Sequence, residues 1–155
     1  MSTRRAIAGL FLSAAAFVGL VASEGYEPVA KPPVAGDVPT NGFGSTGSDI
    51  KLGDKTDPVR ALVRALKDAD QFQLAVQRCV KVPMHQHEFD AAVRLAYNIG
   101  PTAFCSSTVV KRFNVQDYTG ACDAFRMWIK FKGQTVKGLV NRREREYRLC
   151  MGEAT

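Results

Sequence analysis

The stretch EGYEPVAKPPVAGDVPTNGFGSTGSDIKLGDKT (residues 24–56) decides the fold, because it separates an uncharged apolar block from a long series of helical patterns. It is rich in Gly, Pro, Asp, Ser and Thr, which favour turns over long helices. Within it, the dipeptide Asn41-Gly42 is typical of a β-hairpin turn. Residues 24–56 are therefore predicted to form a small β region of turns and short strands.

The apolar block before Glu24 has the length and the flanks of a membrane segment. It runs from Ala6 to Ser23 as AIAGLFLSAAAFVGLVAS, 18 residues without a charge, and it follows Arg4-Arg5. As a helix these residues would span about 27 Å, just short of the hydrocarbon core of about 30 Å. Because a basic flank before an apolar run stays in the cytoplasm, we expect the rest of the chain to be exported.

Three fates are open for this segment. Val21-Ala22-Ser23 is a small-residue cleavage site, so the segment can be a signal peptide that is removed. A permanent anchor is the second interpretation. With six Ala, two Gly and two Ser the segment is only weakly apolar, so the third is an anchor that holds temporarily and then leaves the bilayer. Composition by itself favours the cleaved signal peptide.

Helical periodicity dominates the chain after residue 56. Thr56 or Asp57 can cap a helix that has Pro58 at its first position. The apolar residues that follow at the i, i+3, i+4, i+7 spacing are predicted to face the core: Val59, Leu62, Val63 and Leu66. Further helices are predicted at residues 72–80, 87–98, 106–113, 117–129 (with Trp128 in the core) and 138–151. Together with the small β region, these patterns predict an α+β chain that is mainly helical.

Charge and composition narrow the range of partners. The 155 residues suit one domain, and no fixed-period repeat or sustained heptad pattern is present. Residues 24–155 hold 19 of the 21 basic residues and all 15 acidic residues, a net charge of +4 that suits an anionic cell wall. No nucleic-acid partner is expected, because no aromatic platform accompanies the basic residues.

All the cysteines lie in the exported part of the chain, which favours two disulfides. They allow three pairings: Cys79, Cys105, Cys122 and Cys150. No metal or cofactor is expected, because there is no CxxC or Cys/His finger spacing. His85 and His87 precede a helix without an accompanying carboxylate–His ligand set, so they are interpreted as an exposed helix start.

Glu24 is the candidate acid, because it is the first charge after the apolar block. A carboxyl group beside apolar surroundings favours the protonated form that a general acid needs. Asp37 and Thr40 follow within the same turn-rich stretch. A glycosidase needs such an acid together with a carboxylate or a bound water on the opposite face of the sugar.

Several motifs, in the same order, resemble the phage-type lysozymes, glycoside hydrolase family 24. That family opens its catalytic lobe with a Glu-Gly pair, an acidic residue, and a Thr followed by a Gly-aromatic-Gly turn. Here these are Glu24-Gly25, Asp37, Thr40 and Gly42-Phe43-Gly44. Three later blocks resemble the central helix, its connector and the C-terminal block of the family: FDAAVRLAYNIG (89–100), AFCSSTVVKRFN (103–114) and YTGACDAFRMWIKFKGQTVKGLVNRRERE (118–146). The resemblance covers nearly all of residues 24–150.

The chain departs from the family at the second carboxylate. The usual spacing is Glu, eight residues, Asp or Cys, five residues, and Thr. Pro33 occupies the position after eight residues, whereas twelve residues separate Glu24 from Asp37. The resemblance assigns the carboxylate role to Asp37, because no other Asp lies between Glu24 and the Thr. Glu27 is the poorer candidate, since it lies only one turn from Glu24.

The resemblance implies a two-lobed, lysozyme-like fold and a muramidase. Such an endolysin cuts the β-1,4 bond between N-acetylmuramic acid and N-acetylglucosamine in host peptidoglycan. Glu24 would protonate the glycosidic oxygen, while Asp37 and Thr40 would hold the attacking water. Ser45 stands where many members have His, which puts the usual His–Asp pairing in question. The alternatives are a lytic transglycosylase and a non-catalytic, membrane-anchored wall-binding protein.

The family fold begins with a helix that enters the catalytic Glu, which changes the interpretation of the N-terminus. Cleavage after Ser23 would leave Glu24 without that helix and beside a new ammonium group. We therefore expect residues 1–23 to be kept as a signal-anchor-release segment, and residues 24–155 to form the catalytic domain. The chain would enter the host inner membrane through residues 6–23, by the Sec machinery and with a cytoplasmic N-terminus. It would later pass into the periplasm as a monomer.

Some relatives cage the active site with a cysteine from the anchor. Residues 1–23 contain no cysteine, so no such thiol switch is expected. The four cysteines are then structural, and of the three pairings we favour Cys79–Cys150 and Cys105–Cys122.

Overall fold

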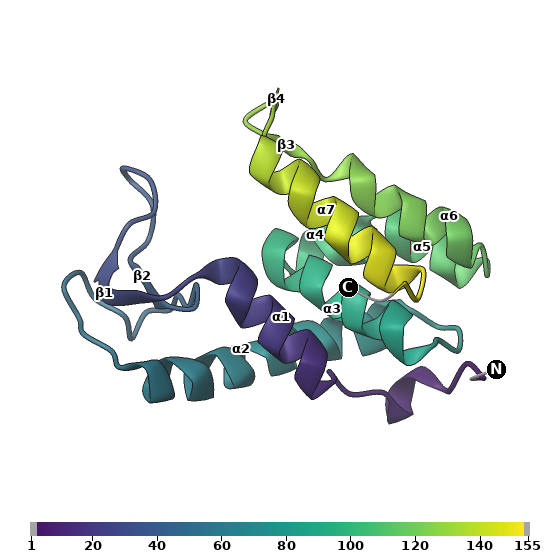
Figure 1. Cartoon of the computed structure of the whole chain (residues 1–155), viewed down its shortest axis with the longest axis horizontal. Coiled ribbons are helices and arrows are strands. Elements are labelled where there is room, and N and C mark those ends of the chain that lie inside the picture. Colours follow the sequence, from purple (N-terminus) through teal and green to yellow (C-terminus); the bar gives the residue numbers. More distant parts are fainter. Residues whose placement is uncertain (1–2, 154–155) are drawn as a thin grey trace. The chain divides into compact units, whose positions relative to one another are not determined.

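A computed structural model of the chain describes residues 3–153 as mainly helical with two small antiparallel sheets (Figure 1). The chain divides into two compact units. The small unit comprises Phe17–Asp70, and the helical unit comprises the residues up to Ala16 and from Gln71 onward. The predicted α+β class with a majority of helix is confirmed.

The apolar segment 6–23 forms two separate elements in this structure. A short 3₁₀ turn, η1 (Ile7–Gly9), is followed by an irregular stretch and then by α1 (Ala14–Glu24). Ser13 immediately precedes α1 and caps its first turn, because its Oγ accepts a hydrogen bond from the Ala16 N–H at 3.1 Å. Within the described part of the chain, no helix combines the length and the apolar character needed to cross a membrane. A single apolar helix over residues 6–23 therefore stays a prediction.

The turn-rich stretch folds as predicted, into short strands joined by turns. β1 (Glu27–Lys31) pairs antiparallel with β2 (Thr40–Gly42), and residues 53–56 hydrogen bond along β1 as well. Asn41 and Ser45 exchange two backbone hydrogen bonds, of 3.0 and 3.2 Å, and so close the turn predicted at this point. The turn follows β2 directly, so it is held in place by the small sheet.

α2 (Pro58–Cys79) is one helix of 22 residues, and the side chain of Asp57 caps its first turn as predicted. The predicted inward face, however, is wrong, because these side chains are exposed: Val59, Leu62, Val63 and Leu66. The buried face consists of alanines: Ala61, Ala65 and Ala69. Alanines permit a close approach, since a Cβ on Gly42 would lie only 3.0 Å from the Ala61 Cβ. A rule that assigns the larger apolar residues to the core cannot recognise such a face.

α3 (Gln86–Ile99) is the central element of the helical unit, and every residue from Glu88 to Ala96 is buried. The helices that pack against it or against one another are α4 (Pro101–Ser106), α5 (Thr108–Asn114), α6 (Tyr118–Asp123) and α7 (Lys137–Cys150). Fully buried aromatic side chains fill this core: Phe89, Phe104, Phe113 and Phe125. The helices predicted from periodicity at 87–98, 106–113 and 138–151 are thus confirmed.

The helix predicted over residues 117–129 is shorter than expected. α6 gives way to the 3₁₀ turn η2 (Ala124–Met127), and then a hairpin of β3 (Lys130–Phe131) and β4 (Gln134–Thr135) leads into α7 (Figure 1). Lys132 and Gly133 form the hairpin turn with φ of 47° and 81°, the left-handed region that two-residue hairpin turns require. Trp128, just before the hairpin, packs against the core as predicted.

The two disulfides join Cys79 to Cys105 and Cys122 to Cys150, so the favoured pairing is wrong. The Cα–Cα distances are 5.4 and 5.6 Å, within the usual range. Cys79 is the last residue of α2 and bonds to Cys105 in α4. Cys150 is the last residue of α7 and bonds to Cys122 in α6. The pairing follows from which helices pack together, and that information is not local in the sequence.

The pairing can be tested by double replacement. The linked cysteines are 26 and 28 residues apart, so the loss of either disulfide should lower the free energy of unfolding by about 3 kcal/mol. Urea denaturation of Cys79→Ser/Cys105→Ser and of Cys122→Ser/Cys150→Ser measures this loss. The mixed variant Cys79→Ser/Cys150→Ser breaks both disulfides and should lose about twice as much. Equal losses in the mixed and matched variants would contradict the pairing.

Candidate active site

Glu24 is the last residue of α1, and its side chain is half-buried. The turn after β2 approaches this carboxyl closely. A Cβ on Gly44 would lie 3.3 Å from the Glu24 Oε2, and Gly44 has a φ of 81°. A side chain at position 44 would be strained and would press on the carboxyl group. The Gly-aromatic-Gly turn is therefore shaped to fit against the acid.

Glu24 and Thr40 line one pocket of about 260 Å³, which we call the Glu24 pocket. Its other lining residues include Tyr26, Glu27, Lys31 and Pro33. Thr40 begins β2, lies opposite Lys31, and donates a hydrogen bond from Oγ1 to the Val38 carbonyl at 3.3 Å. Two of the three predicted site residues therefore share a concave site in the small unit.

Asp37 does not line the Glu24 pocket. It lies in the exposed turn between β1 and β2, where its N–H donates to the Val34 carbonyl at 3.0 Å. Its carboxylate accepts a hydrogen bond from the Val38 N–H, also at 3.0 Å. Pro33, which occupies the family's usual carboxylate position, does line the pocket. The structure thus separates the predicted second carboxylate from the two residues that it was expected to join.

An ion pair that the sequence did not reveal lies in the pocket. Lys31 Nζ is 2.5 Å from Glu27 Oε2, and both side chains line the pocket. The hydrogen bond from Lys31 holds the pKa of Glu27 below its ordinary value, so this carboxyl group is ionised at neutral pH. Glu27 and Lys31 are four residues apart on a strand and therefore share a face. That four-residue spacing was the available signal.

Aromatic contacts fix the turn beside the acid. The rings of Tyr26 and Phe43 lie 5.6 Å apart between centroids. The Tyr26 hydroxyl donates to the Thr56 carbonyl at 2.8 Å. Phe43 is the central residue of the turn after β2, so the pair links that turn to the start of β1.

Ser45, which stands in place of the usual His, binds an aspartate. Its Oγ donates to the Asp68 carboxylate at 2.7 Å, and Arg64 Nε lies 3.2 Å from the other oxygen of that carboxylate. Arg64 also binds Asp49, and this hydrogen bond lowers the pKa of Asp49 to about 2. At the position where many members of the family have His, this chain therefore has a hydrogen bond between Ser45 and Asp68 in place of a His–Asp pair.

His85 and His87 belong to the helical unit, whereas the residues that line the Glu24 pocket belong to the small unit. The rings of His85 and His87 stack with centroids 5.1 Å apart, and His87 Nδ1 is hydrogen bonded to the Cys150 carbonyl at 2.9 Å. Over residues 3–153, no three or more His, Cys, Asp or Glu side chains gather in a way that could hold a metal ion.

The helical unit, together with a small sheet unit in which Glu24 and Thr40 share a pocket, is what a lysozyme-like glycoside hydrolase would have. The solved structures agree. The endolysin from Escherichia coli O157:H7 phage FAHEc1 is 33% identical with a TM-score of 0.83, and the match covers 96% of each chain. The muramidase domain of SpmX from Asticaccaulis excentricus is 28% identical with a TM-score of 0.85, over 92% of this chain and 98% of that one.

The chain belongs to the phage lysozyme family, whose model matches residues 21–146. The SAR-endolysin of Pseudomonas phage phiKMV is 42% identical over 142 residues, which cover 89% of this chain and 87% of the relative. The predicted family and the predicted class of enzyme, a glycoside hydrolase, are confirmed.

The close approach of the turn to the acid predicts the effect of a single methyl group. Gly44→Ala should reduce peptidoglycan hydrolysis at least about tenfold, because the new Cβ meets the Glu24 carboxyl. Gly36→Ala is the matched control, since Gly36 has a φ of 86° but a Cβ there meets nothing within 4 Å. Both variants should lose about 1–2 kcal/mol of stability from the left-handed backbone. Similar activities of the two variants at matched stability would argue against contact with Glu24.

Proposed function

We propose that this chain is an endolysin that hydrolyses the β-1,4 bond between N-acetylmuramic acid and N-acetylglucosamine in host peptidoglycan. The observation that carries the proposal is the Glu24 pocket, in which an acid at the end of α1 shares a concave site with Thr40. Membership of the phage lysozyme family supports it, as do relatives named endolysins and the muramidase domain of SpmX. The net charge of +4 on residues 24–155 favours encounter with an anionic wall.

In this proposal Glu24 is the general acid. It donates its proton to the glycosidic oxygen as the bond to the leaving sugar breaks. The half-buried position of Glu24 and the close contact of the glycine turn limit the orientations that the carboxyl group can adopt. The Thr40 hydroxyl is close enough to share the pocket and holds the water that attacks the sugar.

The second carboxylate of the proposal is Asp37, which completes the Glu–Asp–Thr set of the family. In an inverting enzyme the two carboxyl groups stand about 6.5–9.5 Å apart, with the water between them. Asp37 lies on an exposed turn, so its side chain has freedom to move when a sugar chain binds. Glu27 is the competing carboxylate, because it lines the pocket and is kept ionised by Lys31.

The role of the acid is tested with Glu24→Gln in the full chain. Removal of the acid should lower the rate of wall hydrolysis by about 10²–10⁴-fold while the fold is retained. Mass spectrometry of the wall fragments identifies the reaction, because hydrolysis leaves reducing ends and a lytic transglycosylase leaves anhydro ends. Wall that stays intact with the unaltered chain would support a non-catalytic wall-binding protein instead.

The second carboxylate is tested by two isosteric variants. Asp37→Asn should reduce kcat about 10²-fold or more, and Glu27→Gln should change it much less. The reverse ranking would transfer the role to Glu27. Thermal melting of both variants separates a loss of chemistry from a loss of fold.

The same proposal places residues 1–23 in the host inner membrane as a releasable anchor and residues 24–155 outside it as the catalytic domain. Residues 6–23 span the bilayer after Sec export, with the N-terminus in the cytoplasm. When the membrane potential collapses, the segment is released uncleaved, and the monomeric enzyme is active in the periplasm. The names of the phiKMV and Mu relatives, both SAR-endolysins, support this pathway, as does the Ala- and Gly-rich composition.

Retention of the anchor has a direct structural consequence. α1 begins at Ala14 and ends at Glu24, so cleavage after Ser23 would remove the helix that positions the acid. A chain of residues 24–155 should therefore be at least about 100-fold less active on purified wall than the full chain. Equal activity of the two chains would show that the segment is dispensable and would favour the cleaved signal peptide.

A further inference from the structure

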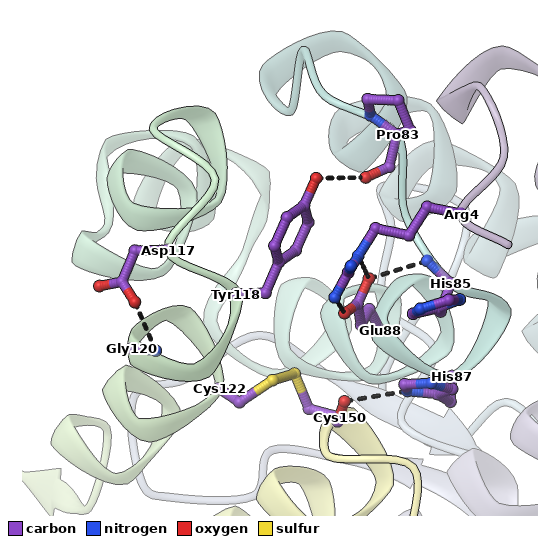
Figure 2. Close-up of polar contacts among 10 residues, drawn as sticks. All are labelled: Arg4, Pro83, His85, His87, Glu88, Asp117, Tyr118, Gly120, Cys122 and Cys150. Carbon is purple, nitrogen blue, oxygen red and sulfur yellow. Dashed lines mark hydrogen bonds and ion pairs between the residues drawn. A yellow bond between two sulfur atoms is a disulfide. The ribbon is translucent and has the colours of Figure 1, made fainter. Parts of the chain in front are cut away.

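The side chain of Arg4 contacts two residues of the helical unit, Glu88 and Tyr118 (Figure 2). Its guanidinium donates from Nε and from one terminal nitrogen to the two oxygens of Glu88, at 3.2 and 2.7 Å. It also lies over the Tyr118 ring, 3.5 Å from the ring centroid. The Glu88 side chain is only 3% exposed, whereas that of Arg4 is 35% exposed. The carboxylate is thus almost wholly enclosed, and the arginine closes the site from outside.

Other contacts within the helical unit hold this site in shape. The Tyr118 hydroxyl donates to the Pro83 carbonyl at 2.9 Å, which fixes the ring (Figure 2). Glu88 accepts the His85 N–H at 2.8 Å, and so closes the first turn of α3. Glu88 is enclosed while Arg4 is bound to it, so the loss of Arg4 should cost more than the loss of an ion pair between two exposed side chains.

The residues that follow Arg4 are bound mainly through their backbone, and we call residues 4–13 the strap. Arg5 pairs with Met84 in an antiparallel bridge, with hydrogen bonds of 2.9 and 3.0 Å. Leu10 is fully buried in the core of the helical unit. Four polar side chains of α2 and α3 bind backbone groups of residues 10–13: Gln73, Gln77, Gln86 and Asp90.

We infer that the helical unit carries a receptor surface for the strap, with Glu88 and Tyr118 as the site that accepts Arg4 after that residue has crossed the membrane. The inference rests on the proposed anchored topology. In that topology Arg4 and Arg5 lie on the cytoplasmic side, whereas Glu88 is exported. The Arg4–Glu88 pair therefore forms only when the whole strap has left the cytoplasm.

This order of events gives the two arginines a function in timing. Each positive charge that moves outward against an inside-negative potential disfavours release by about 50-fold per 100 mV. Arg4 and Arg5 thus oppose release while the membrane is energised, and the opposition disappears when the potential collapses. Arg4 then binds Glu88 and holds the strap on the folded enzyme.

The first experiment measures release from energised inner membranes of cells that express the full chain. The fraction of chain outside the membrane is compared before and after a protonophore is added. Arg4→Gln should raise release before the protonophore by up to about 50-fold per 100 mV, and Arg4→Lys should not. Glu88→Gln should not raise it either, because the same charges cross. Equal release of Arg4→Gln and Arg4→Lys from energised membranes would overturn the charge argument.

The second experiment measures docking in the purified full chain, as the rate of tryptic cleavage after Arg5. Glu88→Gln and Arg4→Gln should each raise this rate at least about tenfold. Glu144→Gln is the matched control, because Arg126 binds Glu144 through the same two-pronged contact and stacks 3.4 Å from the Tyr147 ring, but on an exposed surface. A rate in Glu88→Gln no higher than in Glu144→Gln would overturn the receptor site. If Glu88→Gln does not fold, the cleavage rate of Arg4→Gln tests the same contact, because Arg4 is the more exposed partner.

The inference and the proposed function fail in different ways. Glu24→Gln should abolish wall hydrolysis and leave both the release and the cleavage rate unchanged. A chain that docks as described but cuts no peptidoglycan would refute the proposed function alone. Chain that is already free of the energised membrane would refute the anchored topology, and with it the gating by Arg4.

Discussion

The continuity of α1 up to Glu24 is the constraint on which the active site depends. A general acid must be held in a fixed orientation, and the proposed acid, Glu24, lies in the last turn of α1. That helix consists of residues from the apolar segment, so in the proposed topology the site is incomplete while the segment is in the bilayer. The weakly apolar, Ala-rich composition suits both environments, because alanine favours a helix and adds little to the cost of leaving lipid.

A second constraint acts from the other side of the acid. The turn after β2 approaches Glu24 so closely that a Cβ at position 44 would lie 3.3 Å from its carboxyl oxygen. The small sheet and the contact between Tyr26 and Phe43 hold this turn, so the pocket is shaped by backbone geometry as much as by its charged groups. This backbone-shaped side of the pocket should therefore need little ordering when a substrate binds.

The sequence was most informative where the physics is local. Turn chemistry located the short strands of residues 24–56, and periodicity located α3 and α7, because these elements depend on neighbouring residues. Predictions from the sequence were wrong where the outcome depends on how distant segments pack together. The disulfide pairing depends on which helix ends meet, and the buried face of α2 is formed by alanines that a hydrophobicity pattern ignores. The Glu27–Lys31 pair was missed for another reason: residues four apart share a face on a strand and on a helix alike, so their spacing does not show that they line a pocket.

The strap shows how a segment that is proposed to lie in lipid can also belong to a folded protein. Inside a bilayer its backbone groups must bond to one another, whereas on the helical unit several of them bond to glutamine and aspartate side chains. Two of these side chains, Gln73 and Asp90, are buried in the chain with the strap in place. In the proposed pathway, docking of the strap gives its backbone groups partners on the helical unit, and these contacts favour the released state over the anchored one.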